Sequence, residues 1–386
     1  MTQIQRFIFL AINCLFVTKY VIRLNFDPFI FSLIYCLVAI SLLFLISNYE
    51  KKIKEKNSKI LYFAFLISIL AGILILNFAV DPQKLQVDRW SAIHNFIHNL
   101  FNGIYPYSAH THLGGYGSPF PFWQVFHIPF YLLGNVALGM FFVVILLGGF
   151  LVWYFENYIQ PLFYLLLLTI SPAFWYEVAV HSDLIYNFIL CFIIIGFVYK
   201  RRYSIQNQSF GLGILCGLIL STRLSIIIPF SIFLLPNFLK AQLKNQFIFI
   251  ASSMAVFVLT FLPLVFWDLN SLLFFKYNPF VLQTRQGSII EVIIILSMIY
   301  YYSTNWKNNF TLCLSYIAIT IVVFVLITFF HRMISENFAN SLFSSSYDIT
   351  YFSMALPFVI FSLVSNVFDS SNVSGNNYLK YKNEKP

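Results

Sequence analysis

Long uninterrupted apolar runs dominate this sequence, and they constrain its fold more than any other feature. Segments such as 29–47, 134–153 and 309–330 contain no charged side chain. A bilayer with a hydrocarbon core of roughly 30 Å is crossed by about 20 helical residues. Hydrophobic residues occupy 60% of the 386 positions, which is more than a water-soluble fold of this size buries around one core. The chain is therefore predicted to be an all-α, polytopic membrane protein.

About twelve transmembrane helices are predicted when each crossing is assigned roughly the number of helical residues that the bilayer thickness requires. The two segments within 210–239 are short, and they are interpreted as a hairpin that turns near Arg223. The predicted spans are 7–23, 29–47, 60–80, 134–153, 160–175, 184–199, 210–221, 224–239, 246–266, 288–303, 309–330 and 350–367. They form a single transmembrane domain over residues 1–368, and the Ser-, Asn- and Lys-rich tail 369–386 is expected to be disordered.

Lysine and arginine are distributed unevenly between alternate connections, and this pattern predicts the orientation of the chain. Short loops rich in these residues stay on the cytoplasmic side. One set of alternate connections, with the tail, holds Lys51, Lys52, Lys54, Lys56, Lys59, Lys200, Arg201, Arg202, Lys240, Lys244, Lys307, Lys380, Lys382 and Lys385. The other set is longer and holds only Lys84, Arg89, Arg223, Lys276, Arg285 and Arg332. Both termini are therefore expected in the cytoplasm, and the long loops 81–133, 267–287 and 331–349 on the opposite face.

The remaining composition excludes several classes of protein. The net charge is +9, but the basic residues form short clusters between apolar runs, without the basic stripe that binds nucleic acid. The five cysteines lie inside apolar runs and show no C-x-x-C spacing, so disulfide bonds and structural zinc are not expected. Membrane lipids are the expected surroundings of the chain.

The segment 81–133 is the longest predicted outer loop and carries most of the polar chemistry. Residues 88–101 are predicted to form an amphipathic helix along the outer membrane surface, because apolar residues recur at helical spacing at Trp90, Ile93, Ile97, Leu100 and Phe101. A stiff turn at 105–107 and a flexible glycine-rich loop around 114–117 follow. The Pro-rich segment 119–133 is predicted to re-enter the membrane. The expected fold is therefore a helical bundle with a large extracytoplasmic loop that contains surface and re-entrant helices.

Several features of this loop occur together in a known family. An acidic residue after an early span, a surface helix, a G-x-Y-P-Y turn, a Gly/Tyr loop, a Pro-x-Pro re-entry and the sequence P-F-Y-L-L-G resemble the first outer loop of GT-C class membrane glycosyltransferases. Mannosyltransferase-like and other polyprenyl-sugar-dependent members are the most similar. The resemblance implies transfer of a sugar from a polyprenyl-phosphate donor to a lipid or glycan acceptor on the extracytoplasmic face. It places Asp88, or else Asp81, at the acidic catalytic position.

Sugar transfer requires a base that accepts the proton of the acceptor hydroxyl, and a carboxylate at the membrane surface suits that role. Asp88 is the first candidate for this catalytic base, and Asp81 is the second. Each has a structural alternative. Asp88 stands where it would cap the surface helix, and Asp81 precedes Pro82 at the end of a span.

Five of the seven histidines lie in the same loop, at His94, His98, His110, His112 and His127. Their i, i+4 and H-x-H spacings leave a divalent metal site open, but few carboxylates accompany them. No cofactor is therefore assigned. His94, Tyr105 and Tyr107 are instead predicted to contact sugar or phosphate groups of the substrate, and solvation of an interfacial loop is the alternative for the histidines.

A second polar group is predicted at the outer end of the sixth span. Glu177 and His181 are spaced to pair on one helical face. His181 and Asp183 are candidates for contact with donor or acceptor, because GT-C enzymes often carry a polar group in the corresponding loop; interfacial capping is the alternative. Arg223 lies at a break between two short apolar helices, where an arginine needs a partner. A lipid phosphate is one partner, and a structural ion pair with Asp183 or Asp268 is the alternative.

Two further arginines lie in later outer loops. Arg285 and Arg332 are candidates to line the donor headgroup site, with anchoring at the membrane interface as the alternative. The predicted function is a membrane glycosyltransferase of the hexosyltransferase type. The alternative is a transporter or flippase, or a polymerase, of lipid-linked polysaccharide. A transporter is expected to show paired repeats and polar residues near the middle of the membrane, and neither is evident in the sequence.

Overall fold

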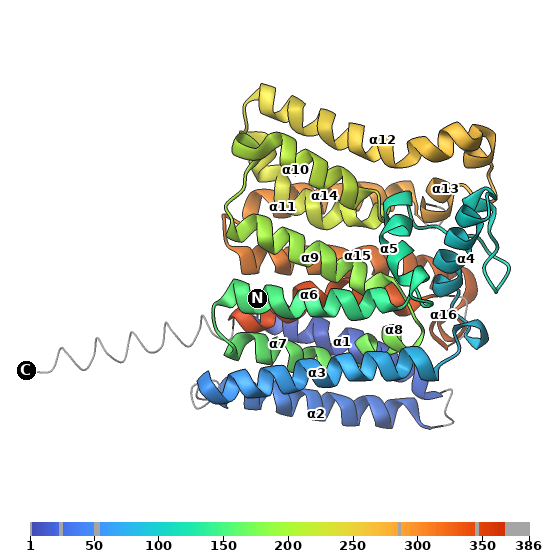
Figure 1. The fold of residues 1–386 in the computed structure, drawn as a ribbon. Coiled ribbons are helices and arrows are strands. Elements are labelled where there is room, and N and C mark those ends of the chain that lie inside the picture. The colour runs from blue at the N-terminus through green and yellow to red at the C-terminus, as the bar shows by residue number, and fades with distance from the viewer. Residues whose placement is uncertain (1, 23–25, 50–54, 285–286, 344–346, 367–386) are drawn as a thin grey trace, which may run out of the picture.

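The computed structural model describes residues 2–22, 26–49, 55–284, 287–343 and 347–366 of the chain. These residues form helices joined by turns, and within the described ranges the only β-type pairing is an isolated bridge between His110 and Tyr116. The long helices lie side by side in one bundle with their axes close to parallel (Figure 1). This architecture confirms the predicted all-α class. The predicted tail 369–386 lies outside the described residues.

Seven helices in the described part of the chain are long and apolar enough to cross a membrane. They are α1 (Thr2–Val21), α2 (Pro28–Tyr49), α3 (Glu55–Ala79), α6 (Leu138–Phe155), α12 (Leu243–Leu273), α15 (Phe310–Glu336) and a final helix over Ile349–Asn366. α7 (Ile159–Thr169) and α8 (Pro172–Ala179) are bent by 67° and together form an eighth candidate. The break falls at Pro172, which has no N–H to continue the hydrogen bonding of α7.

Four shorter apolar helices complete the bundle: α9 (Leu184–Lys200), α10 (Ile205–Leu220), α11 (Ile227–Lys240), which follows a 3-10 turn over Leu224–Ile226, and α14 (Ile289–Asn305). The long helices, the bent pair and these four together correspond to the twelve predicted spans. Only seven or eight of them meet the length needed to cross a bilayer. The chain is therefore a multi-pass helical membrane protein, and the number of twelve crossings remains a prediction.

The final helix and α9 form the centre of the bundle. In the final helix 89% of the residues are buried, against 17% in the apolar stretch of α2, which lies at the edge of the bundle (Figure 1). Phe358 and Phe361 of the final helix contact Phe192 of α9, with ring centroids 6.1 and 5.1 Å apart. A helix enclosed on all sides must be apolar all round. Burial in protein therefore explains some of the apolar runs, and exposure to lipid explains the others.

α10 packs closely against α12 through two glycines one turn apart. A Cβ atom added at Gly213 would stand 2.7 Å from the carbonyl oxygen of Phe249, and one at Gly217 would stand 2.5 Å from that of Ser253. Both distances are too short for a larger side chain. The spacing Gly213-x-x-x-Gly217 is the small-residue pattern that allows membrane helices to approach each other closely.

We expect Gly217→Ala to lower the free energy of unfolding by about 1–3 kcal/mol, because the added methyl group overpacks the contact with α12. The measurement is the thermal unfolding midpoint of the purified protein in detergent. Gly211→Ala in the same helix is the matched control, since a Cβ atom there meets only Gln208 Oε1, at 3.9 Å. Equal effects of the two substitutions would contradict the close approach of α10 and α12.

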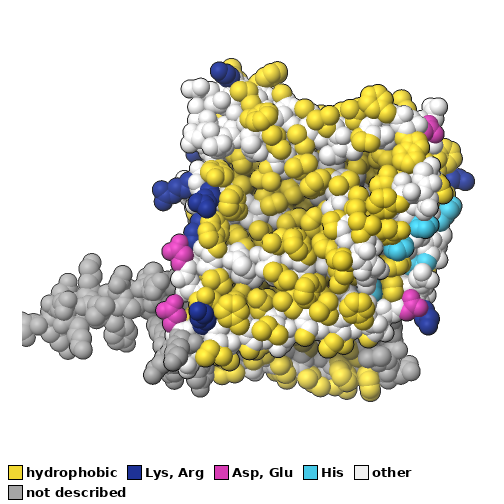
Figure 2. All heavy atoms as spheres, in the orientation of Figure 1, with side chains coloured by type: hydrophobic (Ala, Val, Ile, Leu, Met, Phe, Trp, Pro, Cys, Tyr) yellow, Lys and Arg dark blue, Asp and Glu magenta, His cyan; other side chains and the backbone are white. Residues whose placement is uncertain are grey.

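The two ends of the bundle differ in character. The short helices α4 (Arg89–Phe101), α5 (Pro121–Leu132), α13 (Pro279–Thr284) and α16 (Phe338–Phe343) gather at one end, on the right in Figure 1. In Figure 2 the visible histidines lie at this end, most of the visible Lys and Arg side chains lie at the other, and apolar surface separates them. We call the first the polar-loop end and the second, which carries Lys200, Lys240 and Lys307, the basic end.

Candidate functional site

α4 covers part of the polar-loop end and positions the first candidate residues. It corresponds to the predicted amphipathic helix 88–101. Trp90, Ile93 and Ile97 are buried on one face of α4, whereas Phe101 is exposed. Most of the apolar face therefore packs against the protein, and α4 is docked on the bundle.

The carboxylate of Asp88 is half-buried at the start of α4. Its side chain makes no capping hydrogen bond to the helix, so the capping alternative does not describe it. Thr111 Oγ1 donates a hydrogen bond to Asp88 Oδ2 at 2.7 Å. Asp88 Oδ1 has no hydrogen-bond partner among the described residues. One carboxylate oxygen is thus held by a hydrogen bond, and the other makes none within the described part of the chain.

A tight turn over 111–115 brings Thr111 to Asp88. Thr111 N–H donates to Gly115 O at 2.8 Å, and Gly114 N–H donates to Thr111 O at 2.9 Å. Gly114 has a φ of +81°, which a residue with a side chain rarely adopts. A Cβ atom on Gly115 would stand 3.3 Å from Asp88 Oδ2. The glycines that were predicted to make a flexible loop therefore form a hydrogen-bonded turn beside the carboxylate.

Asp81 has a structural role in this arrangement. Its carboxylate accepts a hydrogen bond from Gln83 N–H at 3.0 Å and lies 3.8 Å from Lys84 Nζ. The Asp81 side chain is exposed and caps the 3-10 turn Pro82–Lys84. These contacts match the capping alternative.

Arg89, which the sequence marked only as a loop charge, is the centre of a buried polar cluster. Its Nη1 donates to Ser182 Oγ at 2.7 Å, and its Nη2 donates to Asp348 Oδ2 at 2.6 Å. Nη1 also lies 3.7 Å from Glu177 Oε1. The side chain of Arg89 is 10% exposed, and that of Glu177 is fully buried. One guanidinium therefore joins α4 to α8, to the α8–α9 connection and to the start of the final helix.

The two carboxylates around Arg89, those of Asp348 and Glu177, differ in how fully their oxygens are hydrogen-bonded. Burial acts to raise the pKa of Asp348, but the charge of Arg89 and the hydrogen bonds from Thr350 outweigh burial and hold that pKa below its usual value. Glu177 Oε2 accepts a hydrogen bond from Ile185 N–H at 3.1 Å. Glu177 Oε1 is buried without a hydrogen-bond partner in the described structure and lies near the charge of Arg89. The cluster thus depends strongly on one guanidinium.

A second buried ion pair joins Asp183 to Arg223. Arg223 Nε donates to Asp183 Oδ2 at 3.2 Å, and Arg223 Nη2 donates to the same oxygen. Trp123 Nε1 also donates to it, at 2.7 Å. Burial acts to raise the pKa of Asp183, but the charge of Arg223 and its hydrogen bonds outweigh burial and lower it. The structure therefore pairs Arg223 with Asp183, as one of the structural alternatives proposed, and not with Asp268.

The backbone break that carries Arg223 is held by the residues at the start of α5. Phe120 N–H donates to Thr222 O at 3.0 Å, and Phe122 N–H donates to Ser221 O at 3.1 Å. The helix break predicted near Arg223 is confirmed, since α10 ends at Leu220 and α11 begins at Ile227. The Pro-rich segment thus fixes Arg223 beside α9.

Some buried polar atoms near this ion pair have no partner within the described residues. Asp183 Oδ1, directly before α9, and Asn187 Nδ2, in the first turn of α9, make no hydrogen bond. Neither side-chain amide atom of Gln124 makes one either. Gln124 is 1% exposed and follows Trp123 in the chain. Buried polar atoms are normally satisfied by protein, water or a ligand.

The predicted pairing of Glu177 with His181 is wrong. α8 ends at Ala179 and His181 has a φ of +53°, so the two residues do not share a helical face. Glu177 lies beside Arg89 instead. His181 is buried, and burial lowers its pKa below the usual value. In sequence, His181 therefore lies between Glu177, which contacts Arg89, and Asp183, which pairs with Arg223.

The loop histidines are distributed among separate environments. His94 stacks on Trp90 with ring centroids 4.5 Å apart, and burial, with the neighbouring His98, lowers its pKa. His127 is fully buried, its Nδ1 donates to Trp123 O at 2.7 Å, and burial lowers its pKa to about 4. No group of three or more His, Cys, Asp or Glu side chains in the described ranges is arranged to hold a metal ion.

Five aromatic side chains form a row from the turn at 111–115 to α12, at the polar-loop end. We call them the aromatic row, and successive ring centroids are 4.5–6.2 Å apart along His110, Tyr116, Tyr277, Tyr105 and Trp267. The Tyr105 hydroxyl is buried without a described partner, and burial raises its pKa. Tyr107 is fully buried and donates to Pro119 O at 2.8 Å. Tyr105 therefore belongs to the row, whereas Tyr107 supports the loop from inside.

The later arginines do not add to these clusters in the described structure. Arg332 lies in the last turns of α15, where its side chain is 46% exposed and pairs with Glu336. Its position matches a surface pair better than a donor site. Arg285 lies outside the described residues.

Sequence reasoning missed Arg89 and Asp348 as partners. The sequence contains the same indication for Arg89 as for Arg223, because an arginine between apolar segments needs a counter-charge. The partner could not be identified, because Asp348 lies 259 positions further along the chain. Only the packing of the final helix against α8 and α9 brings the two residues together.

Comparisons with protein-family models, with curated proteins and with solved structures found no match to this chain. The candidate site therefore stands on its own geometry.

Proposed function

We propose that this chain is a membrane glycosyltransferase that moves a sugar from a polyprenyl-phosphate donor to a lipid or glycan acceptor. The observation that carries the proposal is the environment of Asp88. Its half-buried carboxylate is held through one oxygen by Thr111, and the adjacent His110 begins the aromatic row. A held carboxylate next to a surface of rings suits a base that deprotonates a sugar hydroxyl.

The proposal includes the orientation of the chain. Twelve crossings place both termini in the cytoplasm and the polar-loop end on the extracytoplasmic face. The separation of histidines from most visible Lys and Arg side chains in Figure 2 supports this orientation, because positively charged loops stay in the cytoplasm. A polyprenyl-phosphate donor would then meet Asp88 at the outer headgroup region.

The reaction assigns a role to each group. The acceptor hydroxyl attacks the anomeric carbon while Asp88 Oδ1 accepts the hydroxyl proton, and the bond from that carbon to the phosphate oxygen breaks with its electron pair leaving on the phosphate. Thr111 orients the base through Oδ2. Arg223 uses Nε and Nη2 on Asp183, which leaves Nη1 for the donor phosphate. Guanidinium binds phosphate oxygens well because it is planar and permanently charged.

The aromatic row supports a carbohydrate acceptor. Aromatic faces offer a large, rigid and apolar surface, and tyrosine and histidine add polar edges. Trp267 is 41% exposed, so the row reaches the surface. A sugar ring lying on the row would extend from the end of α12 toward Thr111 and Asp88.

The test is to measure sugar transfer from a panel of radiolabelled polyprenyl-phosphate sugars in proteoliposomes. We expect Asp88→Asn to reduce transfer at least about 100-fold, because a positioned general base contributes a factor of this size or more. Asparagine keeps the shape and the hydrogen bond from Thr111 but cannot accept the proton. The unfolding midpoint of this variant should remain close to that of the wild type.

Two variants control for this substitution. Glu156→Gln changes an exposed carboxylate at the basic end, paired with Lys200 at 2.7 Å, and should leave transfer unchanged. Asp81→Asn asks whether the second carboxylate carries the reaction instead. Full transfer by Asp88→Asn would remove the proposed base. Movement of a lipid-linked glycan across the membrane without sugar transfer would favour the transporter alternative.

A further inference from the structure

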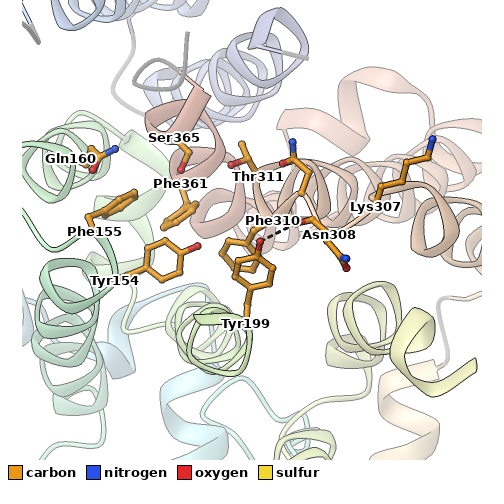
Figure 3. A pocket seen from close by; sticks show the side chains of 11 residues that line it. Tyr154, Phe155, Gln160, Tyr199, Lys307, Asn308, Phe310, Thr311, Phe361 and Ser365 are labelled. Atoms are coloured by element: carbon orange, nitrogen blue, oxygen red, sulfur yellow. Dashed lines mark hydrogen bonds between the residues drawn. The ribbon is translucent and has the colours of Figure 1, made fainter. Parts of the chain in front are cut away.

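Two hollows at the basic end flank the turn between α14 and α15. The larger has a volume of about 530 Å³ and contains a cluster of rings, as Figure 3 shows, from Tyr154, Phe155, Tyr199, Phe310 and Phe361. The smaller has a volume of about 280 Å³ and is lined partly by Lys240, Ser303 and Thr304. Lys307 and Asn308 line both hollows. The hollows are therefore the two sides of one turn.

This turn has an unfavourable backbone conformation that its surroundings hold. Lys307 has a φ of +47° and Asn308 a φ of +61°, a region that residues with side chains rarely adopt. Tyr199 Oη donates to Asn308 O at 2.9 Å, and Asn309 N–H donates to Trp306 O at 2.8 Å. Strained positions of this kind cluster at functional sites. The turn carries Lys307, whose ammonium lies on the side of the turn away from Tyr154, Phe155 and Phe361 (Figure 3).

Positive charge at the turn is not balanced locally. Lys240 and Lys307 form no ion pair with any described residue, and no Asp or Glu lines either hollow. Lys200, at the same end, is by contrast paired with Glu156. α15 begins at Phe310, so the positive end of a 27-residue helix also faces the turn. An anion is the ligand that these groups favour.

The surfaces next to the smaller hollow indicate the source of the anion. Tyr300 and Tyr301 of α14 are 64% and 62% exposed and lie about one turn before Ser303 and Thr304. Leu239, directly before Lys240 in α11, is 54% exposed. The cationic hollow thus continues into apolar helix surface that faces lipid. A phospholipid would contact both the cationic hollow and the apolar helix surface, whereas a soluble phosphate would contact only the hollow.

We infer that the hollows around Lys307 bind the phosphate of an anionic phospholipid from the leaflet at the basic end. Lys307 and Lys240 supply the charge, and the acyl chains lie along α14. This site is independent of the proposed sugar transfer, since it lies at the opposite end of the bundle from Asp88.

The test titrates the purified chain in neutral detergent with phosphatidylglycerol, and in parallel with phosphatidylcholine, while bound lipid is counted by native mass spectrometry. We expect phosphatidylglycerol to bind preferentially. Lys307→Gln and Lys240→Gln should each weaken its binding roughly fivefold, and the double variant about 25-fold, as expected for one lysine contact each at a membrane surface. Both side chains lie at the surface, so the variants should fold.

Lys244→Gln is the matched control, because Lys244 is exposed at the same end but lines neither hollow. Its binding should match that of the wild type. A loss with Lys244→Gln equal to that with Lys307→Gln would overturn the site and leave only a general attraction to a basic surface. Equal binding of the two lipids would overturn the charge argument. Competition by glycerol phosphate at the same concentration as the lipid would overturn the lipid source.

Discussion

Arg223→Met is expected to lower the free energy of unfolding by about 3–5 kcal/mol, which is the cost of leaving a buried charge without its partner. The substitution keeps an unbranched side chain but removes both hydrogen bonds to Asp183 Oδ2. Asp183 is 1% exposed, so water cannot replace the guanidinium. Trp123 Nε1 would remain as the single donor to that oxygen. The measurement is equilibrium unfolding in mixed micelles or the thermal midpoint in detergent.

A double variant separates the charge from the packing. Asp183→Asn combined with Arg223→Met removes both members of the pair and should be more stable than Arg223→Met alone. Arg332→Met is the exposed control, and loss of its surface pair with Glu336 should cost less than about 1 kcal/mol. If the double variant were no more stable than the single one, the ion pair would not be the source of the effect.

The same pair makes stability depend on pH in a defined direction. The pKa of Asp183 is lowered in the folded chain, because the charge of Arg223 outweighs burial. Its contribution to stability is therefore present above the unfolded pKa of an aspartate and is lost as the pH falls through the lower, folded pKa. Arg223→Met removes the main cause of the lowered pKa, so acidification should cost the variant less stability than it costs the wild type.

The sequence predicted the helical class and most helix positions because the apolar runs are long. Burial and lipid exposure both require apolar side chains, so a single pattern located the central final helix and the peripheral α2 equally well. It could not tell which helix lies at the centre. That difference depends on packing between distant segments, such as Phe192 with Phe358, and on glycine contacts such as Gly217 with α12.

The polar site was predictable only where neighbours in sequence are neighbours in space. The position of α4 followed from local pattern, whereas the glycine-rich segment after it, predicted to be a flexible loop, forms the turn that brings Thr111 to Asp88. The Glu177–His181 pairing failed because it assumed one continuous helix, whereas α8 ends at Ala179. The partners of Arg89 could not be predicted from the sequence, because the carboxylates that contact it come from α8 and from the residue before the final helix.

Arg89→Gln is expected to lower the free energy of unfolding by about 3–5 kcal/mol, because it leaves a buried charge without its partner, as Arg223→Met does. Here two carboxylates, not one, lose their counter-charge. Glu177 and Asp348 share one guanidinium, and without it the fully buried Glu177 and the partly exposed Asp348 both lose their counter-charge. Arg89→Lys should recover only part of this loss, because an ammonium group cannot bridge Ser182 and Asp348 as the planar guanidinium does. Arg89→Gln/Glu177→Gln should recover more, since it removes one of the opposed charges.

The pH dependence of Arg89→Gln distinguishes this explanation from a simple loss of packing. Without Arg89, the pKa of Asp348 in the folded variant is expected to rise above its value in the wild type, because burial is then opposed only by the hydrogen bonds from Thr350 and the charge of Lys19. The deficit in stability should therefore shrink as the pH falls and the carboxyl groups become protonated, and it should grow as the pH rises through the raised pKa. A deficit that stays constant between pH 4 and 8, measured against Lys84→Gln as the exposed control, would mean that Arg89 acts through its side-chain volume. Because Arg89 directly follows Asp88, the same variant should also lose sugar transfer at pH values where it is still folded, with Arg89→Lys intermediate.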